Sequence, residues 1–230
     1  MAEHGLAVVL GTGGIGTALR DELLSRGQYA QVLALGRTTE PAFDVTDEAR
    51  IATAAAHVAA QHLPLRLLVL ATGFLHGDSG QPERSWAHLD SAYLQQVFQV
   101  NAVGPALVMK HFLPLLPTTG PCVAGFLSAR VGSVGDNALG GWYGYRASKA
   151  ALNQLVKTAA IELARRNKQA VCVALHPGTV ATALSQPFAK TGLKVRPPAE
   201  AARELLAVLA GLNASQSGGF VDHLGHTVPW

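Results

Sequence analysis

The sequence is poor in cysteine, charged residues and long apolar runs. Its two cysteines, Cys122 and Cys172, each lie in an apolar stretch without a partner at metal-ligand spacing. Disulfide-stapled scaffolds and metal clusters are therefore excluded, and a reducing compartment is favoured, so we expect a cytoplasmic protein. No apolar run reaches the ~18–20 residues that a membrane helix needs, because Arg66 interrupts the longest candidate. The opening MAEHG is too short for a signal peptide.

Charge is also low and evenly distributed. Only 14% of the 230 residues are charged, and the net charge is +3 without a long run of like charges. That distribution gives no support for nucleic-acid binding. A chain of this length that is 49% hydrophobic can bury a full core, which excludes a disordered or collagen-like chain. We expect one domain over residues 1–230.

Short apolar runs alternate with longer stretches of helical period. The runs predict buried strands at 5–10, 31–36, 43–45, 66–71, 123–128, 170–176 and 218–222. Helices are predicted at 15–26, 47–61, 89–116, 143–166 and 199–212. This order predicts an α/β fold, a single doubly wound Rossmann domain with a mostly parallel sheet of about seven strands and helices on both faces. Two loops, 76–88 and 178–198, follow strands at their carboxyl ends, where ligands bind in such sheets.

A glycine-rich turn follows the first predicted strand and leads directly into a helix. Its residues, which fit the pattern G-x-G-x-x-G, are Gly11, Thr12, Gly13, Gly14, Ile15 and Gly16. The glycines permit a tight turn and close approach to a pyrophosphate, and the helix N-terminus supplies amide donors to the anion. The order strand, turn, helix favours a dinucleotide site. A purely structural turn and an adenosyl methionine site are the alternatives.

Arg37 and Asp44 bear on the choice of cofactor. The second predicted strand is followed by Arg37, where a ribose with a free 2′-hydroxyl would call for an acid. A guanidinium matches a 2′-phosphate, which predicts NADP(H) in preference to NAD(H), with a solvated loop arginine as the alternative. Asp44 would either hydrogen-bond an adenine amine or cap the following helix.

Tyr145 and Lys149 lie at the start of the helix predicted at 143–166. Positions i and i+4 share one helix face, so the phenol and the ammonium can address one ligand together. The pKa of a tyrosine is near 10, and a nearby cation lowers it toward the range of general acid–base catalysis. Taken alone, the pair could equally be an ordinary amphipathic first turn.

Together these motifs resemble the short-chain dehydrogenase/reductase family. The glycine turn, the Asp44 segment, Asn101 in QVNAVGPA, YRASK at 145–149 and the segment 177–182 occur in the family's order over nearly the whole chain. SARVGSVGDNALGGWYGYRASKAALN and the ending GHTVPW resemble the branch that includes the bacterial C-factor signalling protein. The resemblance implies hydride transfer between NADP(H) and a small, fairly apolar carbonyl or alcohol, by a homodimer or homotetramer. A dinucleotide-binding signalling or regulatory protein with incidental turnover is the alternative.

The resemblance also implies roles for single residues. Tyr145 would be the general acid–base, Lys149 would hold the nicotinamide ribose and lower the tyrosine pKa, and Asn101 would support a water-linked proton relay. Further cofactor contacts would come from Val45, Ala71, Thr72, Gly73, Pro177, Gly178, Val180 and Thr182. A mostly apolar pocket would come from Phe74, Leu75, Trp142, Ser185 and Phe188.

The chain departs from the family pattern at three points. The glycine turn is one residue shorter than usual, and Ala71-Thr72-Gly73 replaces the usual N-A-G. Ala129 stands where the family has a serine that polarises the substrate. We predict that Ser128 supplies the missing donor, with Ser133, or else a backbone amide or a water, as the alternatives.

Overall fold

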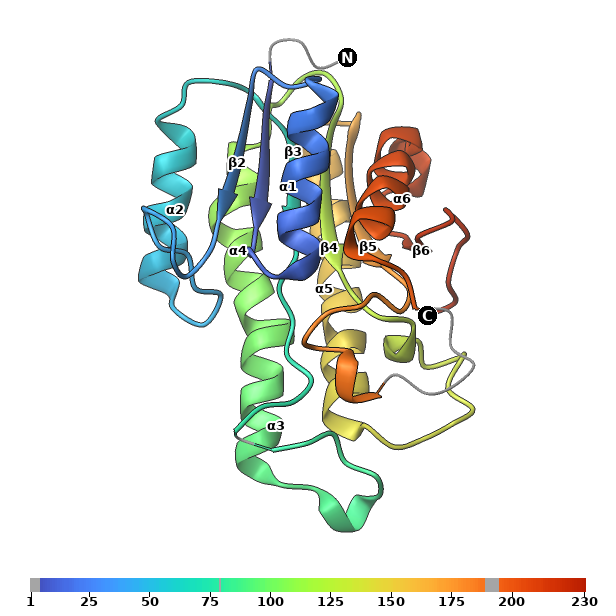
Figure 1. Ribbon diagram of the computed structural model, residues 1–230. Helices are drawn as coiled ribbons and strands as arrows, with labels where there is room; N and C mark the ends of the chain where they lie inside the picture. Colours follow the sequence, from blue (N-terminus) through green and yellow to red (C-terminus); the bar gives the residue numbers. More distant parts are fainter. Residues whose placement is uncertain (1–4, 79, 189–194) are drawn as a thin grey trace.

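Six strands form one sheet in the computed structural model, which describes residues 5–78, 80–188 and 195–230 (Figure 1). They are β1 (Leu6–Leu10), β2 (Gln31–Leu35), β3 (Leu65–Leu70), β4 (Cys122–Leu127), β5 (Ala170–His176) and β6 (Phe220–Asp222). Their order is β2-β1-β3-β4-β5-β6, and every neighbouring pair is parallel. The predicted doubly wound parallel sheet is confirmed.

The predicted strand at 43–45 is absent, so the sheet has six strands rather than about seven. The Asp44 carboxylate accepts hydrogen bonds from the backbone N (2.9 Å) and the hydroxyl (2.7 Å) of Thr46. Such a local turn competes with the sheet ladder for the backbone, which is why this short apolar run stays a loop.

Helices cover both faces of the sheet. They are α1 (Gly14–Arg26), α2 (Glu48–Ala59), α3 (Ser91–Phe98), α4 (Gly104–Phe112), α5 (Tyr143–Arg166) and α6 (Pro198–Gly211). Leucines of α1 and α6 pack with one set of alternate strand residues, and α2, α4 and α5 pack with the other set (Figure 1). No helix of the described ranges is long and apolar enough to cross a membrane.

The helix predicted at 89–116 is divided by a π-helical turn. After α3 comes a π-helical segment, Gln99–Val103, then α4 and a short 3₁₀ turn, Leu113–Leu115. Pro105 has no backbone N–H to donate into the preceding turn, which accounts for a widened turn at this point. Asn101, a predicted site residue, lies within the π-helical segment.

Candidate active site

A cleft of about 870 Å³ opens at the carboxyl ends of β1, β2 and β3. It brings together nine of the predicted cofactor residues, namely Gly11, Thr12, Gly13, Arg37, Asp44, Val45, Ala71, Thr72 and Gly73. The remaining predicted residues lie outside its wall, on α1, the π-helical segment, α5 and the segment after β5. The topology therefore gathers the segments at 11–13, 36–46 and 71–74 around one concave surface, as expected in an open parallel sheet.

The glycine turn has the geometry that an anion site at a helix N-terminus requires. Gly11 has a φ of +105°, and a side chain on Gly16 would collide with the Gly11 carbonyl oxygen. The space beside Gly13, in contrast, is open. The first turn of α1 thus begins directly at the cleft with room beside its free amide groups.

Thr72 adds an unused polar group to this surface. Its Oγ1 is buried and has no hydrogen-bond partner among the described residues. Buried polar groups are normally partnered, so an unpartnered hydroxyl in the cleft wall is a place where a polar ligand fits.

Arg37 and Asp44 lie together at the outer part of the cleft. Arg37 is exposed and forms no ion pair with another described residue. Although partial burial opposes it, hydrogen bonds from Thr46 hold the pKa of Asp44 below its usual value, with a smaller contribution from Arg37. The N-terminal cap of α2 is Asp47, whose carboxylate accepts from Arg50 N at 3.1 Å, so Asp44 is not the helix cap.

Tyr145 and Lys149 are buried on one face of α5, where the ammonium Nζ lies 5.8 Å from the centre of the phenol ring. Nζ also donates to the carbonyl oxygen of Leu127, at the end of β4, at 3.0 Å. Burial lowers the pKa of Lys149 to about 8. Burial, and then the neighbouring Tyr93, raises the pKa of Tyr145 above its usual value, and a lowering by Lys149 stays a prediction.

Asn101 is held close to Lys149 by a set of short hydrogen bonds. Its amide accepts from Phe74 N at 2.9 Å and donates to Phe74 O at 2.8 Å and to Ser148 Oγ at 3.2 Å. A Cβ placed on Gly73 would lie 3.6 Å from Lys149 Nζ and 3.7 Å from Asn101 Oδ1. Gly73 therefore joins the cofactor cleft to both residues. Sequence reasoning missed Ser148, although its place in YRASK is a usable signal.

The two candidate serines, Ser128 and Ser133, lie beside α5 at different positions along its axis. Ser128 donates its proton to Asn153 Oδ1 at 2.7 Å, and Asn153 lies eight residues after Tyr145, about 12 Å along the helix axis. The turn before Ser133 packs one helical turn after Tyr145, because a Cβ on Gly132 would lie 2.7 Å from the Lys149 Cβ, and Arg146 donates to the Val131 carbonyl oxygen at 3.3 Å. These contacts place the Ser128 hydroxyl away from Tyr145.

The Ser133 hydroxyl accepts a hydrogen bond from Asp136 N at 3.1 Å. Among the described residues, its own proton has no acceptor. The Ser133 hydroxyl proton is thus uncommitted among the described residues, whereas that of Ser128 is donated to Asn153.

An aromatic wall stands beside Tyr145. The ring of Trp142 packs edge-on against the rings of Tyr145 and Phe188, with distances between ring centres of 6.2 Å and 5.1 Å. His76 packs edge-on against Phe188 at 5.4 Å, and its Nε2 lies 3.1 Å from the Ala183 carbonyl oxygen. The loop at 76–88 thus contacts the segment after β5, of which residues 189–194 lie outside the described part of the chain.

The segment after β5 closes against the glycine turn. A Cβ on Gly14 would lie 2.9 Å from the Thr182 methyl, and Val180 is buried. The base of the segment is tied down by Arg196, which donates to Pro177 O at 3.0 Å. Gly178, another predicted cofactor residue in this segment, has a φ of +72°, in the left-handed region that favours glycine. The segment therefore stands where it can border a ligand bound at the turn.

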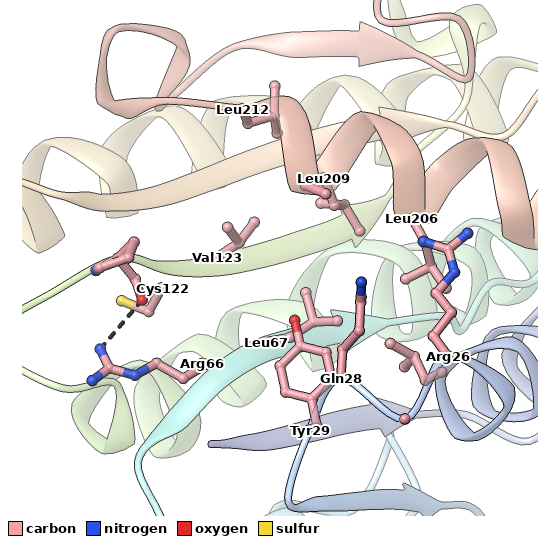
Figure 2. A pocket seen from close by; sticks show the side chains of 14 residues that line it. Arg26, Gln28, Tyr29, Arg66, Leu67, Cys122, Val123, Leu206, Leu209 and Leu212 are labelled. Atoms are coloured by element: carbon pink, nitrogen blue, oxygen red, sulfur yellow. Dashed lines mark hydrogen bonds between the residues drawn. The ribbon is translucent and has the colours of Figure 1, made fainter. Parts of the chain in front are cut away.

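A second cavity of about 580 Å³ lies at the opposite end of the sheet, between the ends of α1 and α6 (Figure 2). Leu67 lines this cavity, and at one edge of it Arg66 donates to the Pro121 carbonyl oxygen at 3.2 Å. Arg26 is paired with Glu22 at 2.9 Å. Both guanidinium groups already have hydrogen-bond partners, Arg66 on backbone carbonyl oxygens and Arg26 on a carboxylate, so the candidate site is the cleft at the other end.

Comparisons with known proteins agree with this geometry. Residues 4–203 match the model of a family described as enoyl-(acyl carrier protein) reductase. The C-signal of Myxococcus xanthus is 38% identical over 142 residues, covering 62% of this chain and 81% of that protein. A 1-hydroxy-2-glutathionyl-2-methyl-3-butene dehydrogenase of Rhodococcus sp. (strain AD45) is 32% identical over 202 residues, covering 87% and 84%.

Solved structures share the fold over the full length. The NADPH-bound carbonyl reductase from chicken fatty liver has a TM-score of 0.86 and 25% identity, with 100% of both chains covered. The carbonyl reductase Sniffer of D. melanogaster has a TM-score of 0.84 and 23% identity, covering 99% of this chain and 100% of that one.

Proposed function

The chain belongs to the short-chain dehydrogenase/reductase family, and we propose that it transfers hydride between NADP(H) and a small, fairly apolar carbonyl or alcohol. The observation that carries the proposal is the buried pair Tyr145 and Lys149, one helical turn apart and joined through Gly73 to the cleft. Such a pair at the end of a dinucleotide cleft is what proton transfer beside a bound nicotinamide requires.

The cleft fits a dinucleotide. The free amides of α1 suit the pyrophosphate, the open space at Gly13 admits it, and the unpartnered Thr72 hydroxyl offers a further hydrogen bond. Arg37 stands exposed at the rim, where its guanidinium can pair with a 2′-phosphate and so favour NADP(H). Asp44 retains the role of hydrogen-bonding the adenine amine. When bound, the cofactor supplies or accepts the hydride.

Tyr145 handles the proton. Its raised pKa keeps the phenol protonated, which suits a donor to a carbonyl oxygen that gains negative charge. Lys149, whose pKa of about 8 leaves it mostly charged at pH 7, stabilises the phenolate that remains. Asn101 supports a relay through water that returns the proton by way of Lys149.

A second donor is needed at the carbonyl oxygen, because Ala129 has none to offer. The prediction that Ser128 fills this role has the weaker support, since its proton is already donated to Asn153. The uncommitted proton of Ser133 and the position of its turn beside α5 support Ser133.

One observation favours a second candidate function, a dinucleotide-binding regulator with incidental turnover. Ala129 removes a hydroxyl that catalysis would use, and the M. xanthus relative is named a signal protein. If the protein is a regulator, NADPH should bind tightly and turnover should be negligible. If it is an enzyme, NADPH should bind tightly and a substrate should be turned over.

A screen of aldehydes, ketones and quinones, followed by the loss of NADPH absorbance, tests the proposal. Tyr145→Phe serves as the matched control in every assay. Turnover that depends on Tyr145 supports the enzyme. NADPH binding without turnover on any substrate supports the regulator, and absence of NADPH binding overturns both.

We also propose that the chain assembles as a homodimer or homotetramer. Exposed apolar side chains on the outer helices support this, among them Val103 in the π-helical segment and Ile161 on α5. Light scattering at micromolar concentration measures the mass, and a monomer would refute the assembly.

A further inference from the structure

Glu83, in the loop at 76–88, has a carboxylate buried at the start of the helix that carries Tyr145. The residue is only 2% exposed. Its two carboxylate oxygens accept from the backbone N of Gly144, at 3.1 and 3.2 Å. Gly144 is the second residue of α5 and immediately precedes Tyr145. A side chain from one loop therefore caps the helix that supplies the candidate proton donor.

The positive end of a helix compensates the buried charge. Within the described residues, no Lys, Arg or His nitrogen forms an ion pair with Glu83. The 24-residue helix α5 instead presents its N-terminal amides and the positive end of its dipole to the carboxylate. Gly144 permits this approach, because a Cβ there would lie 3.0 Å from Glu83 Oε1. The contact thus depends on the negative charge of Glu83 and on the absence of a side chain at Gly144.

The backbone of Glu83 holds the residue just before the helix. Its carbonyl oxygen accepts from Trp142 N at 2.6 Å. Trp142 has a left-handed conformation, with φ +53° and ψ +44°, which is unusual for a bulky residue and needs support from its surroundings. In this position the indole lies against Tyr145 and Phe188. Both ends of Glu83 therefore act on groups that border the phenol.

We propose that Glu83 is a positioning residue, which fixes the start of α5 and the Trp142 ring and thereby holds the Tyr145 phenol where it meets the substrate. The role rests on the proposed function for its effect on turnover. The contacts themselves do not depend on that function. Glu83 also couples the loop that borders the substrate to the helix that carries the proton donor.

Hydrogen exchange tests the contacts without any substrate. In the unmodified protein the amides of Trp142 and Gly144 should be protected, although they stand at the edge of a loop. Glu83→Gln keeps the length of the side chain but removes its charge and one acceptor, so the Gly144 amide, which donates to that carboxylate, should exchange at least tenfold faster. Glu48→Gln, at an exposed first-turn glutamate of α2, is the control and should leave both amides unchanged. Unprotected amides in the unmodified protein, or unchanged exchange in Glu83→Gln, would overturn the proposal.

Kinetics separate positioning from loss of folded protein. With NADPH-binding sites titrated by fluorescence, kcat per site should fall at least tenfold in Glu83→Gln, and the Kd of NADPH should change less than twofold. Gly144→Ala, which pushes the carboxylate away, should reproduce both results and keeps the test open if Glu83→Gln folds poorly. A kcat per site within twofold of the unmodified protein would refute the role. If no substrate is found at all, the exchange measurements still decide whether Glu83 anchors α5.

Discussion

Replacing Lys149 with methionine should abolish turnover and, at neutral pH, make the fold more stable. The ammonium is buried, with one hydrogen bond to the Leu127 carbonyl oxygen and a contact with the Tyr145 ring. Methionine has a similar length and shape but no charge to desolvate. The fold therefore tolerates this charge at a cost in stability, and removing the charge should recover part of it.

The magnitude follows from the pKa. Burial lowers the pKa of Lys149 from 10.5 to about 8, and the gap corresponds to about 3 kcal/mol at about 1.4 kcal/mol for each pH unit. Methionine also leaves the Leu127 carbonyl oxygen without its donor, which costs about 1–2 kcal/mol. The net gain at pH 7 is therefore about 1–2 kcal/mol.

The dependence on pH gives the sharper test. Because the folded-state pKa is depressed, the folded protein binds fewer protons than the unfolded chain between about pH 8 and 10.5, so its stability rises with pH there. The advantage of Lys149→Met should fall by about 2.5 kcal/mol between pH 7 and pH 10 and should therefore change sign within that interval. Urea unfolding of both proteins at each pH measures the difference, in which all other titrating groups cancel. A gap that does not change with pH would show that Lys149 is not desolvated in the folded protein.

Four further predictions concern single side chains. Tyr145→Phe should lower kcat by a factor of at least about 10³ with little change in NADPH affinity, measured by stopped-flow turnover and fluorescence titration, because it removes a proton donor and no binding group. NADPH should bind at least tenfold tighter than NADH, a difference of about 1.4 kcal/mol, and Arg37→Ala should erase most of it; equal titrations in the unmodified protein would make Arg37 a bystander. Ser133→Ala should lower kcat/KM by about 10²–10³ while Ser128→Ala changes it little, and the opposite order would restore Ser128 as the donor. His176, whose pKa is lowered mainly by burial to about 4, should cost the fold about 3 kcal/mol as pH falls from about 6.5 to 4, and His176→Gln should remove that loss in urea midpoints.

Features that depend on local geometry could be predicted from the sequence. The glycine turn is one, because the space that Gly16 must leave free is taken by the Gly11 carbonyl oxygen only five residues away. The pairing of Tyr145 with Lys149 is another, because helical spacing alone places the two on one face. The parallel sheet followed from the alternation of apolar runs with helical stretches.

Features that depend on distant contacts could not be predicted. Glu83 caps α5 across 61 residues of sequence, and nothing around it in the chain signals that role. The direction of the Tyr145 pKa depends on burial, which residue spacing does not reveal. The position of Pro105, four residues after Asn101, could have indicated the π-helical turn. The apolar pattern of helical period continues across this point, so that pattern alone predicts one uninterrupted helix.

Substrate choice belongs to this second class, because the wall beside Tyr145 comes from three segments that meet only in the folded chain. Trp142 precedes α5, Phe188 follows β5, and His76 joins them from the loop after β3. Two buried charges of the described residues already have partners: the Glu83 carboxylate caps α5, and Arg196 is paired with Glu204 at 2.6 Å, whereas the Lys149 ammonium lies beside Tyr145 itself. A charged substrate would lose its hydration against these aromatic rings, which costs several kcal/mol. A neutral carbonyl compound with an apolar body would meet no such penalty, so the screen should begin with aromatic and aliphatic aldehydes and ketones before acidic analogues.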